Sequence, residues 1–427
     1  MSLILLLSMN HNSFPFICKH VSFRRYSDIN IYDFQNDESY IIDDEAYALL
    51  KLLNGKKPLK QIIESFPIEK REEVSDIVDN FQELGLIDFL THEINDNAYI
   101  MKLHDNLPSE NPVSTPYLKN LMINLTEKCN LTCKHCYITN KNLLDFPLEK
   151  VKDIINEFYK LQGIKVILTG GEPYLYPNLK ELLTYLLDIP IQKLMLTNAT
   201  LIKEKPELLD LLKQNYFDIY VSIDGLKSTH NDFRDANCFQ DSLDGIKLLL
   251  ESDITTSINT MVHKQNITEF DEMLQLINSL GKIKNWSIDI PTFDESISKE
   301  IRKKYEISFE EGGNILRDYG WGVIYESEAS NLACGPNLMA IDVLGMVTKC
   351  GFFYEDNVGN VLDLGVKKSW KFIQEKLNWP LNSLRCNELN CEFLEQCRGG
   401  CRYRAFKHTN DIHGIDSFTC YKFGKLK

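Results

Sequence analysis

The sequence lacks a surplus of positive charge and lacks any long apolar run. Its 427 residues include 47 lysines and arginines against 61 aspartates and glutamates, a formal net charge of −14. Because nucleic acids attract basic surfaces, this balance disfavours a nucleic-acid partner. The apolar residues 1–9 have no basic segment before them and are far shorter than the ~20 residues of a bilayer span. We therefore expect a cytoplasmic protein with no membrane partner.

Cysteine, by contrast, is abundant and unevenly distributed. Of the twelve cysteines, three lie within residues 129–136, seven lie within residues 334–420, and only Cys18 and Cys238 stand apart. Structural disulfides are rare in the cytosol, so twelve cysteines in such a chain indicate metal binding or redox chemistry. The two dense groups are the candidate metal sites.

The first group places Cys129, Cys133 and Cys136 at Cx3Cx2C spacing, directly after the apolar residues 121–125. Three thiolates can bind three irons of a 4Fe–4S cube and leave the fourth iron open for chemistry. A structural zinc site would normally be closed by a fourth Cys or His. His135 lies between two of the cysteines, where it is poorly placed to bind the same metal. A zinc knuckle and a buried cysteine cluster are the alternatives.

This motif, with the aromatic ring of His135 before its third cysteine, resembles the signature of the radical S-adenosylmethionine (SAM) enzymes. Residues 169–173, Thr-Gly-Gly-Glu-Pro, follow another apolar run and are similar to the second motif of that family. The resemblance implies that Cys129, Cys133 and Cys136 hold the catalytic cluster. It also implies that the amino and carboxylate groups of SAM chelate the open iron.

The resemblance further implies a SAM pocket. Gly170 and Gly171 would let the backbone approach SAM closely, and Glu172 with Pro173 would fix a turn that presents carbonyls to the amine. Arginine suits the SAM carboxylate because its planar fork bonds bidentately. The expected cofactor-binding residues are His135, Gly170, Gly171, Glu172, Pro173, Asn198, Ser222 and Arg234.

Three of these residues have a plainer alternative. His135 is expected to pack on adenine, and otherwise is a loop histidine facing solvent. Arg234 would face the SAM carboxylate, and otherwise forms a surface ion pair. Asn198 follows a strand, where asparagine is often only a turn former.

The second group of cysteines has an ordered spacing of its own. Cys334 is followed by ten residues, Gly345, four residues and Cys350, and five more cysteines follow. This order resembles the SPASM extension of radical SAM enzymes, although four residues rather than two separate the next pair. The five later cysteines are Cys386, Cys391, Cys397, Cys401 and Cys420.

The resemblance implies two auxiliary 4Fe–4S clusters in this region. Auxiliary cluster I would be held by Cys334, Cys350 and Cys401, and residues 335–344 supply no further cysteine. Its last iron is therefore expected to be open, bound by a non-cysteine group, or reserved for substrate. A cysteine-rich zinc ribbon is the alternative. Auxiliary cluster II would be held by Cys386, Cys391, Cys397 and Cys420.

The N-terminal residues 14–89 have the pattern of a small winged-helix unit. A helix capped by Asp43 or Asp44 ends near Gly55, two further apolar stripes at helical spacing follow, and the strand-like residues 86–89 close the unit. The arrangement resembles the PqqD-like recognition element, which binds the leader of a ribosomally made, modified peptide as an added strand. A plain scaffold and a DNA-binding winged helix are the alternatives.

In the middle of the chain, strand-like runs alternate with helical ones, which indicates a parallel sheet. Radical SAM relatives close such a sheet into a partial (β/α)6 barrel, with reactive groups at the C-terminal ends of its strands. The motifs above fall at those ends. The six expected strands are residues 121–125, 165–168, 193–196, 218–223, 255–262 and 286–290.

The expected fold is therefore α/β: a partial (β/α)6 TIM-like barrel with an N-terminal winged-helix domain and a C-terminal iron–sulfur (SPASM) domain. The linker is placed by three prolines among polar residues. The expected division is residues 1–105 for leader recognition, 106–117 for the linker, 118–310 for the barrel, 311–333 for a bridging segment and 334–427 for the SPASM domain.

The expected function is that of a radical SAM/SPASM peptide maturase, an oxidoreductase. It would use three 4Fe–4S clusters, SAM, an external low-potential electron donor and a precursor peptide with a leader. A thioether link to a substrate cysteine is the preferred product, because the eighth cysteine is missing. The alternatives are carbon–carbon crosslinking, epimerisation with Cys238 as a hydrogen donor, and sulfatase-maturase-like side-chain oxidation. An iron–sulfur winged-helix regulator is the non-enzyme alternative.

Overall fold

The structure is a computed structural model that describes residues 12–94, 107–136, 138, 142–293, 297–321, 331–353 and 356–426. The expectations for residues 1–9 and for a boundary at residues 105–106 concern parts outside the described residues. The chain divides into two compact units, and each is described by itself. The first comprises Met1–Pro112 with Leu187–Ile191, and the second comprises Val113–Leu186 with Gln192–Lys427.

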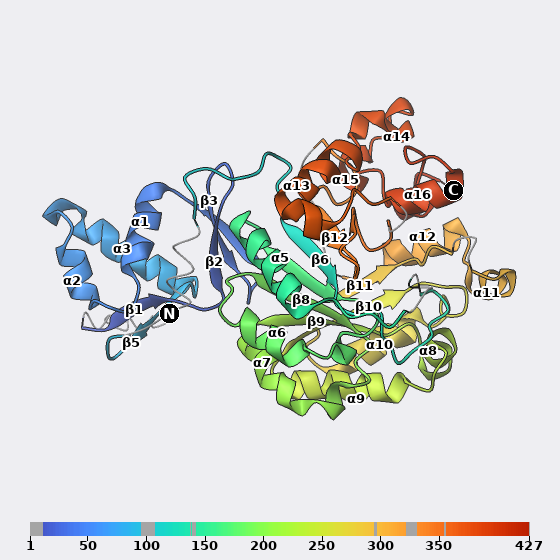
Figure 1. The fold of residues 1–427 in the computed structure, drawn as a ribbon, viewed down its shortest axis with the longest axis horizontal. Coiled ribbons are helices and arrows are strands. Elements are labelled where there is room, and N and C mark those ends of the chain that lie inside the picture. The colour runs from blue at the N-terminus through green and yellow to red at the C-terminus, as the bar shows by residue number, and fades with distance from the viewer. Residues whose placement is uncertain are drawn as a thin grey trace, which may run out of the picture. The chain divides into compact units, whose positions relative to one another are not determined.

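The described residues of the first unit form two small antiparallel sheets and several helices (Figure 1). One sheet pairs β1 with β5, and the other has the strand order β2-β3-β4. The strands are β1 (Phe14–Ile17), β2 (Val21–Arg25), β3 (Ile29–Asp33), β4 (Glu38–Ile42) and β5 (Ile87–Leu90). The helices are α1 (Asp44–Leu52), α2 (Leu59–Glu64), α3 (Arg71–Glu83) and the short 3-10 helix η1 (Ile68–Lys70).

The helices of this unit form where the apolar spacing predicts them. The side chain of Asp43 caps α1 by accepting a hydrogen bond from the Ala46 amide at 2.8 Å. Tyr47 and Leu50 of α1 lie in the same buried cluster as Val78 of α3. The expected capped helix, the two helical segments after it and the closing strand are thus present as α1, α2, α3 and β5.

The second unit is built on an eight-stranded sheet with the order β11-β10-β9-β8-β7-β6-β12-β13. Each neighbouring pair from β11 to β12 is parallel, and β13 is antiparallel to β12. The six expected strands are confirmed as β6 (Asn120–Asn124), β7 (Lys165–Thr169), β8 (Gln192–Thr197), β9 (Phe217–Ser222), β10 (Thr255–Met261) and β11 (Trp286–Asp289).

Two further strands join this sheet from the C-terminal region. β12 (Leu338–Ile341) pairs with β6, and β13 (Val347–Thr348) follows it at the edge. Leu338 and Ala340 pack in the same buried cluster as Met122 of β6. The region that the sequence assigns to a separate cysteine-rich domain therefore begins inside the central sheet.

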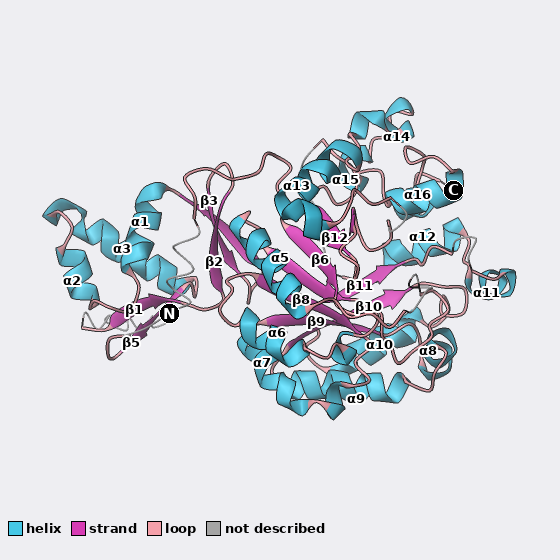
Figure 2. Cartoon of the chain, in the orientation of Figure 1, coloured by secondary structure: helices cyan, strands magenta, loops and turns pink. Residues whose placement is uncertain are grey.

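Helices connect the strands of the second unit and lie outside the sheet (Figures 1 and 2). In α5, Val151, Ile155 and Phe158 form the buried face at the expected helical spacing. The helices that connect the sheet strands are α5 (Leu148–Lys160), α6 (Leu179–Leu186), α7 (Leu209–Gln214), α8 (Lys227–Arg234), α9 (Phe239–Glu251) and α10 (Phe270–Leu280). Shorter 3-10 helices are η2 (Pro173–Leu175), η3 (Ile202–Glu204) and η4 (Pro206–Leu208).

The remaining helices belong to the C-terminal part. The expected boundary between residues 310 and 311 falls inside α12, which spans residues 309–318. Gly312 and Gly313 allow this helix to lie close to Phe418 and Tyr421 of α17. A Cβ on Gly313 would lie 2.2 Å from that of Tyr421. These helices are α11 (Lys299–Tyr305), α12 (Phe309–Asp318), α13 (Val361–Lys376), η5 (Leu381–Ser383), α14 (Arg385–Glu388), α15 (Leu394–Cys397), α16 (Arg402–Thr409) and α17 (Ser417–Lys422).

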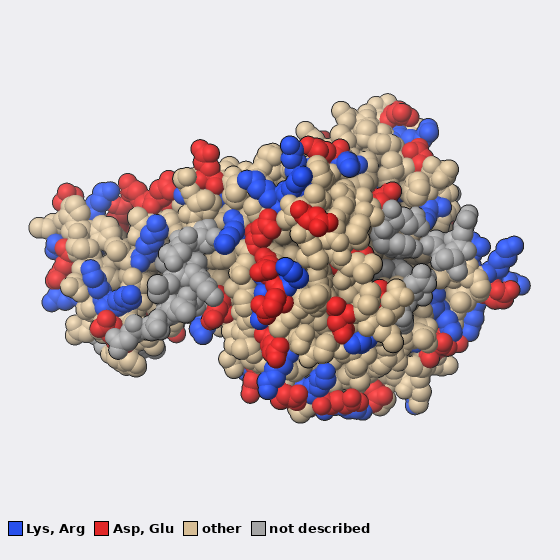
Figure 3. All heavy atoms as spheres, in the orientation of Figure 1, with Lys and Arg blue, Asp and Glu red and all other residues tan. Residues whose placement is uncertain are grey.

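The molecular surface mixes both signs of charge. On the face drawn in Figure 3, lysine and arginine side chains are interspersed with aspartate and glutamate. Among the described residues, no helix is both long enough and apolar enough to cross a bilayer.

Candidate active site

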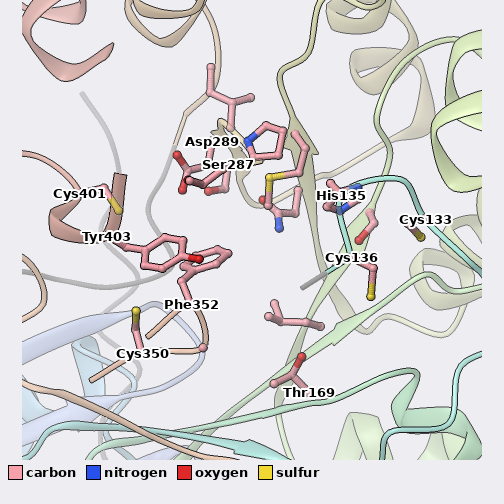
Figure 4. Close-up of a pocket in the computed structure, with 18 of the residues that line it drawn as sticks. Cys133, His135, Cys136, Thr169, Ser287, Asp289, Cys350, Phe352, Cys401 and Tyr403 are labelled. Carbon is pink, nitrogen blue, oxygen red and sulfur yellow. The ribbon is translucent and has the colours of Figure 1, made fainter. Parts of the chain in front are cut away.

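A cavity of about 790 Å³ lies at the C-terminal ends of the parallel strands. Cys129, Cys133 and Cys136 line it after β6. Cys334, Cys350 and Cys401 line it as well, although they lie about two hundred residues later in the chain. Figure 4 shows four of these six cysteines around the cavity, with Cys350 and Cys401 on one side and Cys133 and Cys136 on the other. The structure thus brings the first cysteine group and three cysteines of the second group to one cavity.

The loop of the first cysteine group is held against the loop after β7. The amide of Gly171 donates to the carbonyl of Thr126 at 2.6 Å, and the amide of Glu172 donates to the carbonyl of Lys128 at 2.7 Å. A Cβ on Gly170 would lie 2.4 Å from the Thr126 carbonyl oxygen, and one on Gly171 only 2.1 Å from that of Lys128. The two glycines are therefore required by the close approach of the two loops.

Glu172 points into the protein rather than into the open cavity. Its buried carboxylate accepts hydrogen bonds from the amide of Tyr174 at 3.1 Å, the hydroxyl of Thr197 at 2.8 Å and the amide of Asn198 at 2.9 Å. Burial raises the pKa of Glu172, and these hydrogen bonds oppose the rise. The residue ties the end of β7 to the end of β8, and the buried Pro173 begins η2 directly after it.

Asn198 supports the cysteine loop from the next strand. Its Nδ2 donates to Oδ1 of Asn130 at 3.0 Å, and its own Oδ1 accepts from the amide of Thr200 at 3.0 Å. Asn198 therefore acts as a turn residue and also fixes the residue that follows Cys129. In the sequence, only the position of Asn130 between Cys129 and Cys133 could have indicated this role.

Arg234 is buried beside the cysteine loop and lines the cavity. Its Nε donates to Oδ2 of Asp224 at 2.5 Å, and Nη2 forms an ion pair with the same carboxylate. Its Nη1 lies 3.7 Å from the Sγ of Cys133. Although burial opposes it, the negative charge of Asp224 and Cys133 raises the pKa of Arg234. Ser222, the last residue of β9, also lines the cavity.

His135 lies between Cys133 and Cys136 and is stacked on Phe233. The two ring centroids are 4.5 Å apart with an interplanar angle of 10°. Phe233 in turn stacks on His263 at 3.9 Å. Burial, with the charge of Arg234, lowers the pKa of His135 well below its usual range, so the ring is neutral. Sequence reasoning missed the Phe233 and His263 rings, because nothing local to either residue signals their shared stack.

The four remaining C-terminal cysteines lie apart from the cavity lining. Burial raises the pKa of the Cys420 thiol to about 12, and negative charge on Cys386, Cys397 and Cys391 adds to the rise. Cys386 lies on α14, Cys397 on α15, Cys420 on α17, and Cys391 between α14 and α15. None of the twelve cysteines is in a disulfide.

The cavity presents cysteine thiols, which are the ligands that iron–sulfur clusters use. In the described part of the chain, no three His, Cys, Asp or Glu side chains are close enough together to hold one metal ion. In a cube each thiolate binds a different iron, so its sulfurs need not converge on one point. Cys129, Cys133 and Cys136 share one loop and one cavity wall, as such ligation requires.

Comparison with known proteins agrees with this geometry. Residues 123–277 match the radical SAM superfamily. They form a radical SAM domain. The match begins in β6, which precedes the three cysteines, and ends in α10, so it contains the loop of the second motif as well.

Related proteins include peptide-modifying members of this superfamily. The chain is 25% identical to the antilisterial bacteriocin subtilosin biosynthesis protein AlbA of Bacillus subtilis (strain 168), across 94% of each chain. It is 27% identical to an AdoMet-dependent heme synthase of Methanosarcina barkeri (strain Fusaro / DSM 804), across 70% of this chain and 96% of that protein.

The fold is shared with a solved structure. Streptococcus suis SuiB bound to its precursor peptide SuiA superposes with a TM-score of 0.60 at 16% identity. The superposition covers 95% of this chain and 99% of the SuiB chain. The mixed α/β fold with its large parallel sheet is therefore the radical SAM fold that SuiB displays.

Proposed function

We propose that this radical SAM enzyme modifies a ribosomally made precursor peptide. One observation carries the proposal: a single cavity is lined both by the three cysteines of the radical SAM domain and by three of the C-terminal cysteines. The match to AlbA supports it, because that relative is covered over 94% of its length. The heme synthase matches only 70% of this chain, which leaves less of the chain explained.

In this proposal Cys129, Cys133 and Cys136 hold the catalytic 4Fe–4S cluster. With SAM and an electron from an external low-potential donor, that cluster supplies a 5′-deoxyadenosyl radical, which takes a hydrogen atom from the peptide. The residues of the chain position SAM and exclude water. Gly170 and Gly171 shape the wall, Glu172 and Pro173 fix the turn, and Asn198 braces the loop.

Ser222, Arg234 and His135 complete the proposed SAM site. Arg234 faces the SAM carboxylate with Nη1 while Asp224 holds its other two nitrogens. One face of His135 is covered by Phe233, so adenine packs on the other. Ser222 contacts the ribose from the end of β9.

The C-terminal cysteines hold two auxiliary 4Fe–4S clusters. Cluster I takes Cys334, Cys350 and Cys401, which border the cavity, and cluster II takes the other four. Seven cysteines leave one iron of cluster I without a thiolate, and thiolate is the soft ligand that iron–sulfur clusters use. A substrate cysteine at that iron would be placed to form a thioether.

Epimerisation fits the site less well. It needs a hydrogen donor in the cavity, and Cys238 is the only cysteine in the barrel outside the first motif. Cys238 is 4% exposed and is not among the residues that line the cavity. Its Sγ lies 3.5 Å from Nε2 of His230, and burial raises the pKa of its thiol to about 11. Cys238 is therefore a packed core residue.

The first unit is proposed to bind the leader of the peptide as an added strand. β4 is an edge of the sheet β2-β3-β4, and an edge offers backbone groups to a further strand. Tyr40 and Ile42 of β4 pack on the core, while the side chain of Ile41 is 72% exposed. An apolar side chain so exposed on an edge strand is a suitable leader contact.

A matched pair of substitutions tests leader binding. Ile68 is 79% exposed on η1 of the same unit, away from the edge strand in sequence. Ile41→Asp should weaken affinity for the precursor peptide about tenfold, the equivalent of about 1.4 kcal/mol. Ile68→Asp should leave it unchanged. Fluorescence anisotropy with a labelled leader measures both, and equal affinities for the two variants would contradict the leader role.

The overall function is tested by coexpression. The full chain is produced with the short reading frames that flank its gene, and each small peptide is analysed by mass spectrometry. We expect one peptide to lose two hydrogen atoms per link, with the loss dependent on Cys129, Cys133 and Cys136. Omission of residues 14–89, the part of the first unit proposed to bind the leader, should abolish the modification and leave uncoupled formation of 5′-deoxyadenosine largely intact. Equal loss of both activities would make that unit a scaffold.

Thiolate binding at cluster I has its own test. The spectrum of that cluster should change when the peptide is added and should stay unchanged when its cysteines are replaced by serine. If a protein side chain closes cluster I in the presence of peptide, cluster I is left with electron transfer alone.

A further inference from the structure

The cavity holds one carboxylate that the proposed function does not use. Of its described lining residues, only Glu172 and Asp289 are acidic. Glu172 is 1% exposed, and its carboxylate already accepts three hydrogen bonds inside the protein. Asp289 ends β11, and its side chain is 42% exposed. Asp289 is therefore the acidic group that a molecule in the cavity can reach.

The two oxygens of Asp289 have different surroundings. Oδ1 accepts a hydrogen bond from the amide of Ile290 at 2.8 Å and from Nη1 of Arg404. In the described part of the chain, no hydrogen bond engages Oδ2. Figure 4 shows the Asp289 carboxylate in the cavity, between the side chains of Cys401 and His135 in this view. One oxygen is thus anchored while the other is offered to the cavity.

Arg404 holds the Asp289 carboxylate in place and also has a second carboxylate partner. This buried guanidinium also binds the carboxylate of Asp416, through Nη2 at 3.0 Å and Nε at 3.3 Å. The same Oδ2 of Asp416 accepts the amide of Cys401 at 2.8 Å. The chain of contacts from Asp289 to Cys401 fixes the carboxylate beside the proposed cluster I. Because Asp416 remains, Arg404 keeps a partner when Asp289 is changed.

A base at this place has a defined task. When an oxidation joins a C–H carbon of the peptide to an atom X that carries hydrogen, the C–H and X–H bonds break and one C–X bond forms. One hydrogen leaves as an atom to the 5′-deoxyadenosyl radical. The other leaves X as a proton, and one electron passes to an auxiliary iron–sulfur cluster. The hydrogen atom and the electron have acceptors in the proposed function, but the proton has none.

We propose that Asp289 is the proton acceptor for the peptide, a catalytic residue that takes the proton of X–H on Oδ2. This assignment rests on the proposed function. Arg234, Arg317 and Lys422 also line the cavity, but they are cations and have no free acceptor for a proton. A peptide bound between the two cysteine groups would therefore meet one exposed carboxylate.

The test compares Asp289→Asn with Asp241→Asn in the full, iron-reconstituted chain. Asp241 is also an ion-paired aspartate, bound to Lys203, and its side chain is 41% exposed on α9. The probe is the precursor peptide from the coexpression experiment, synthesised with deuterium on the carbons that become linked. Three quantities are measured: iron content, deuterium in 5′-deoxyadenosine, and crosslinked peptide.

We expect Asp289→Asn to keep the iron and the deuterium transfer but to form crosslinked peptide about 10²-fold more slowly, the lower range for loss of a general base. Asp289→Glu should recover part of the rate, and Asp241→Asn should match the wild type. Crosslinking by Asp289→Asn within threefold of the wild type would overturn the assignment. So would loss of iron or of deuterium transfer, since Asp289 would then only hold Arg404. If the wild type itself transfers no deuterium, the proposed function fails instead.

Discussion

The first cysteine group and three cysteines of the second line one cavity, but the chain holds the two groups in different ways. Cys129, Cys133 and Cys136 lie on a loop that the parallel sheet fixes from the side through backbone hydrogen bonds of Gly171 and Glu172. Of the cysteines of the proposed cluster II, Cys386 and Cys397 lie on α14 and α15, helices of four residues each, Cys420 lies on α17, and Cys391 lies between α14 and α15. Helices that short have little stability of their own.

This difference in support indicates in which region the proposed iron–sulfur clusters would contribute to folding. The first loop is positioned by strands whose burial does not involve a metal, so the open cluster can bind and react without reshaping its site. The proposed ligands of cluster II lie on three short helices and one loop, so metal binding there would be coupled to folding. The sheet thus provides a fixed reaction centre, and the clusters themselves would order the C-terminal wall of the cavity.

The largest effect should come from removal of the first group alone. The triple substitution Cys129→Ala, Cys133→Ala, Cys136→Ala removes the ligands of one cube, so about four irons per chain and all SAM cleavage should be lost. The auxiliary clusters should remain, because their ligands are untouched. Iron analysis and chromatography of 5′-deoxyadenosine measure both quantities. Formation of 5′-deoxyadenosine by the triple variant would refute the assignment of the reaction centre.

A single added methyl group should break the support of the first loop. Gly171→Ala would place a Cβ 2.1 Å from the backbone oxygen of Lys128, where neither partner is flexible. If relieving this clash costs the positioned loop about 3 kcal/mol, the rate of SAM cleavage should fall about 10²-fold. Gly85→Ala is the control, since no atom lies within 4 Å of its Cβ and only its positive φ is strained. Similar SAM cleavage by the two variants would mean that the close approach does not matter.

Removal of iron should affect amide exchange in the C-terminal cysteine region and not in the loop after β7. In the iron-free protein, amides within residues 384–420 should exchange with deuterated solvent about tenfold faster than in the reconstituted protein, because the cysteine region loses its bound clusters. The amides of Gly171 and Glu172 should keep their protection, since their acceptors are backbone carbonyls. Mass spectrometry of peptic fragments reads both regions at once. Uniform exchange in both states would contradict the comparison.

The smallest effect is expected at Arg234. Arg234→Lys keeps a cation near Asp224 but loses the fork that reaches Asp224 and Cys133 together. Affinity for SAM should fall about fivefold, the equivalent of about 1 kcal/mol. Equilibrium dialysis with the reconstituted variant measures it. An unchanged affinity would leave Arg234 as an internal partner of Asp224 only.

The central sheet, and the position of the first three cysteines at its edge, could be predicted from the sequence. The six central strands are apolar runs between helical segments, and Cys129, Cys133 and Cys136 stand in a spacing that few other sites share. Local pattern carries this information, because each strand end delivers its loop to the same edge of a parallel sheet. The cap of α1 at Asp43 was predictable for the same reason.

Contacts between distant segments could not be predicted in this way. The pairing of β12 with β6 joins residues about two hundred positions apart, and no local period signals it. The inward turn of Glu172 depends on donors from β8, and the place of Asp289 in the cavity depends on Arg404. These residues acquire their roles only when the sheet and the C-terminal helices pack together.

The most direct test of the account uses the reconstituted, reduced wild-type protein with SAM and a precursor peptide deuterated at its linked carbons. The account predicts that deuterium appears in 5′-deoxyadenosine and that the same peptide molecules become crosslinked, in equal amounts. Formation of 5′-deoxyadenosine without deuterium and without any change in the peptide would contradict the claim that this radical SAM enzyme acts on a peptide.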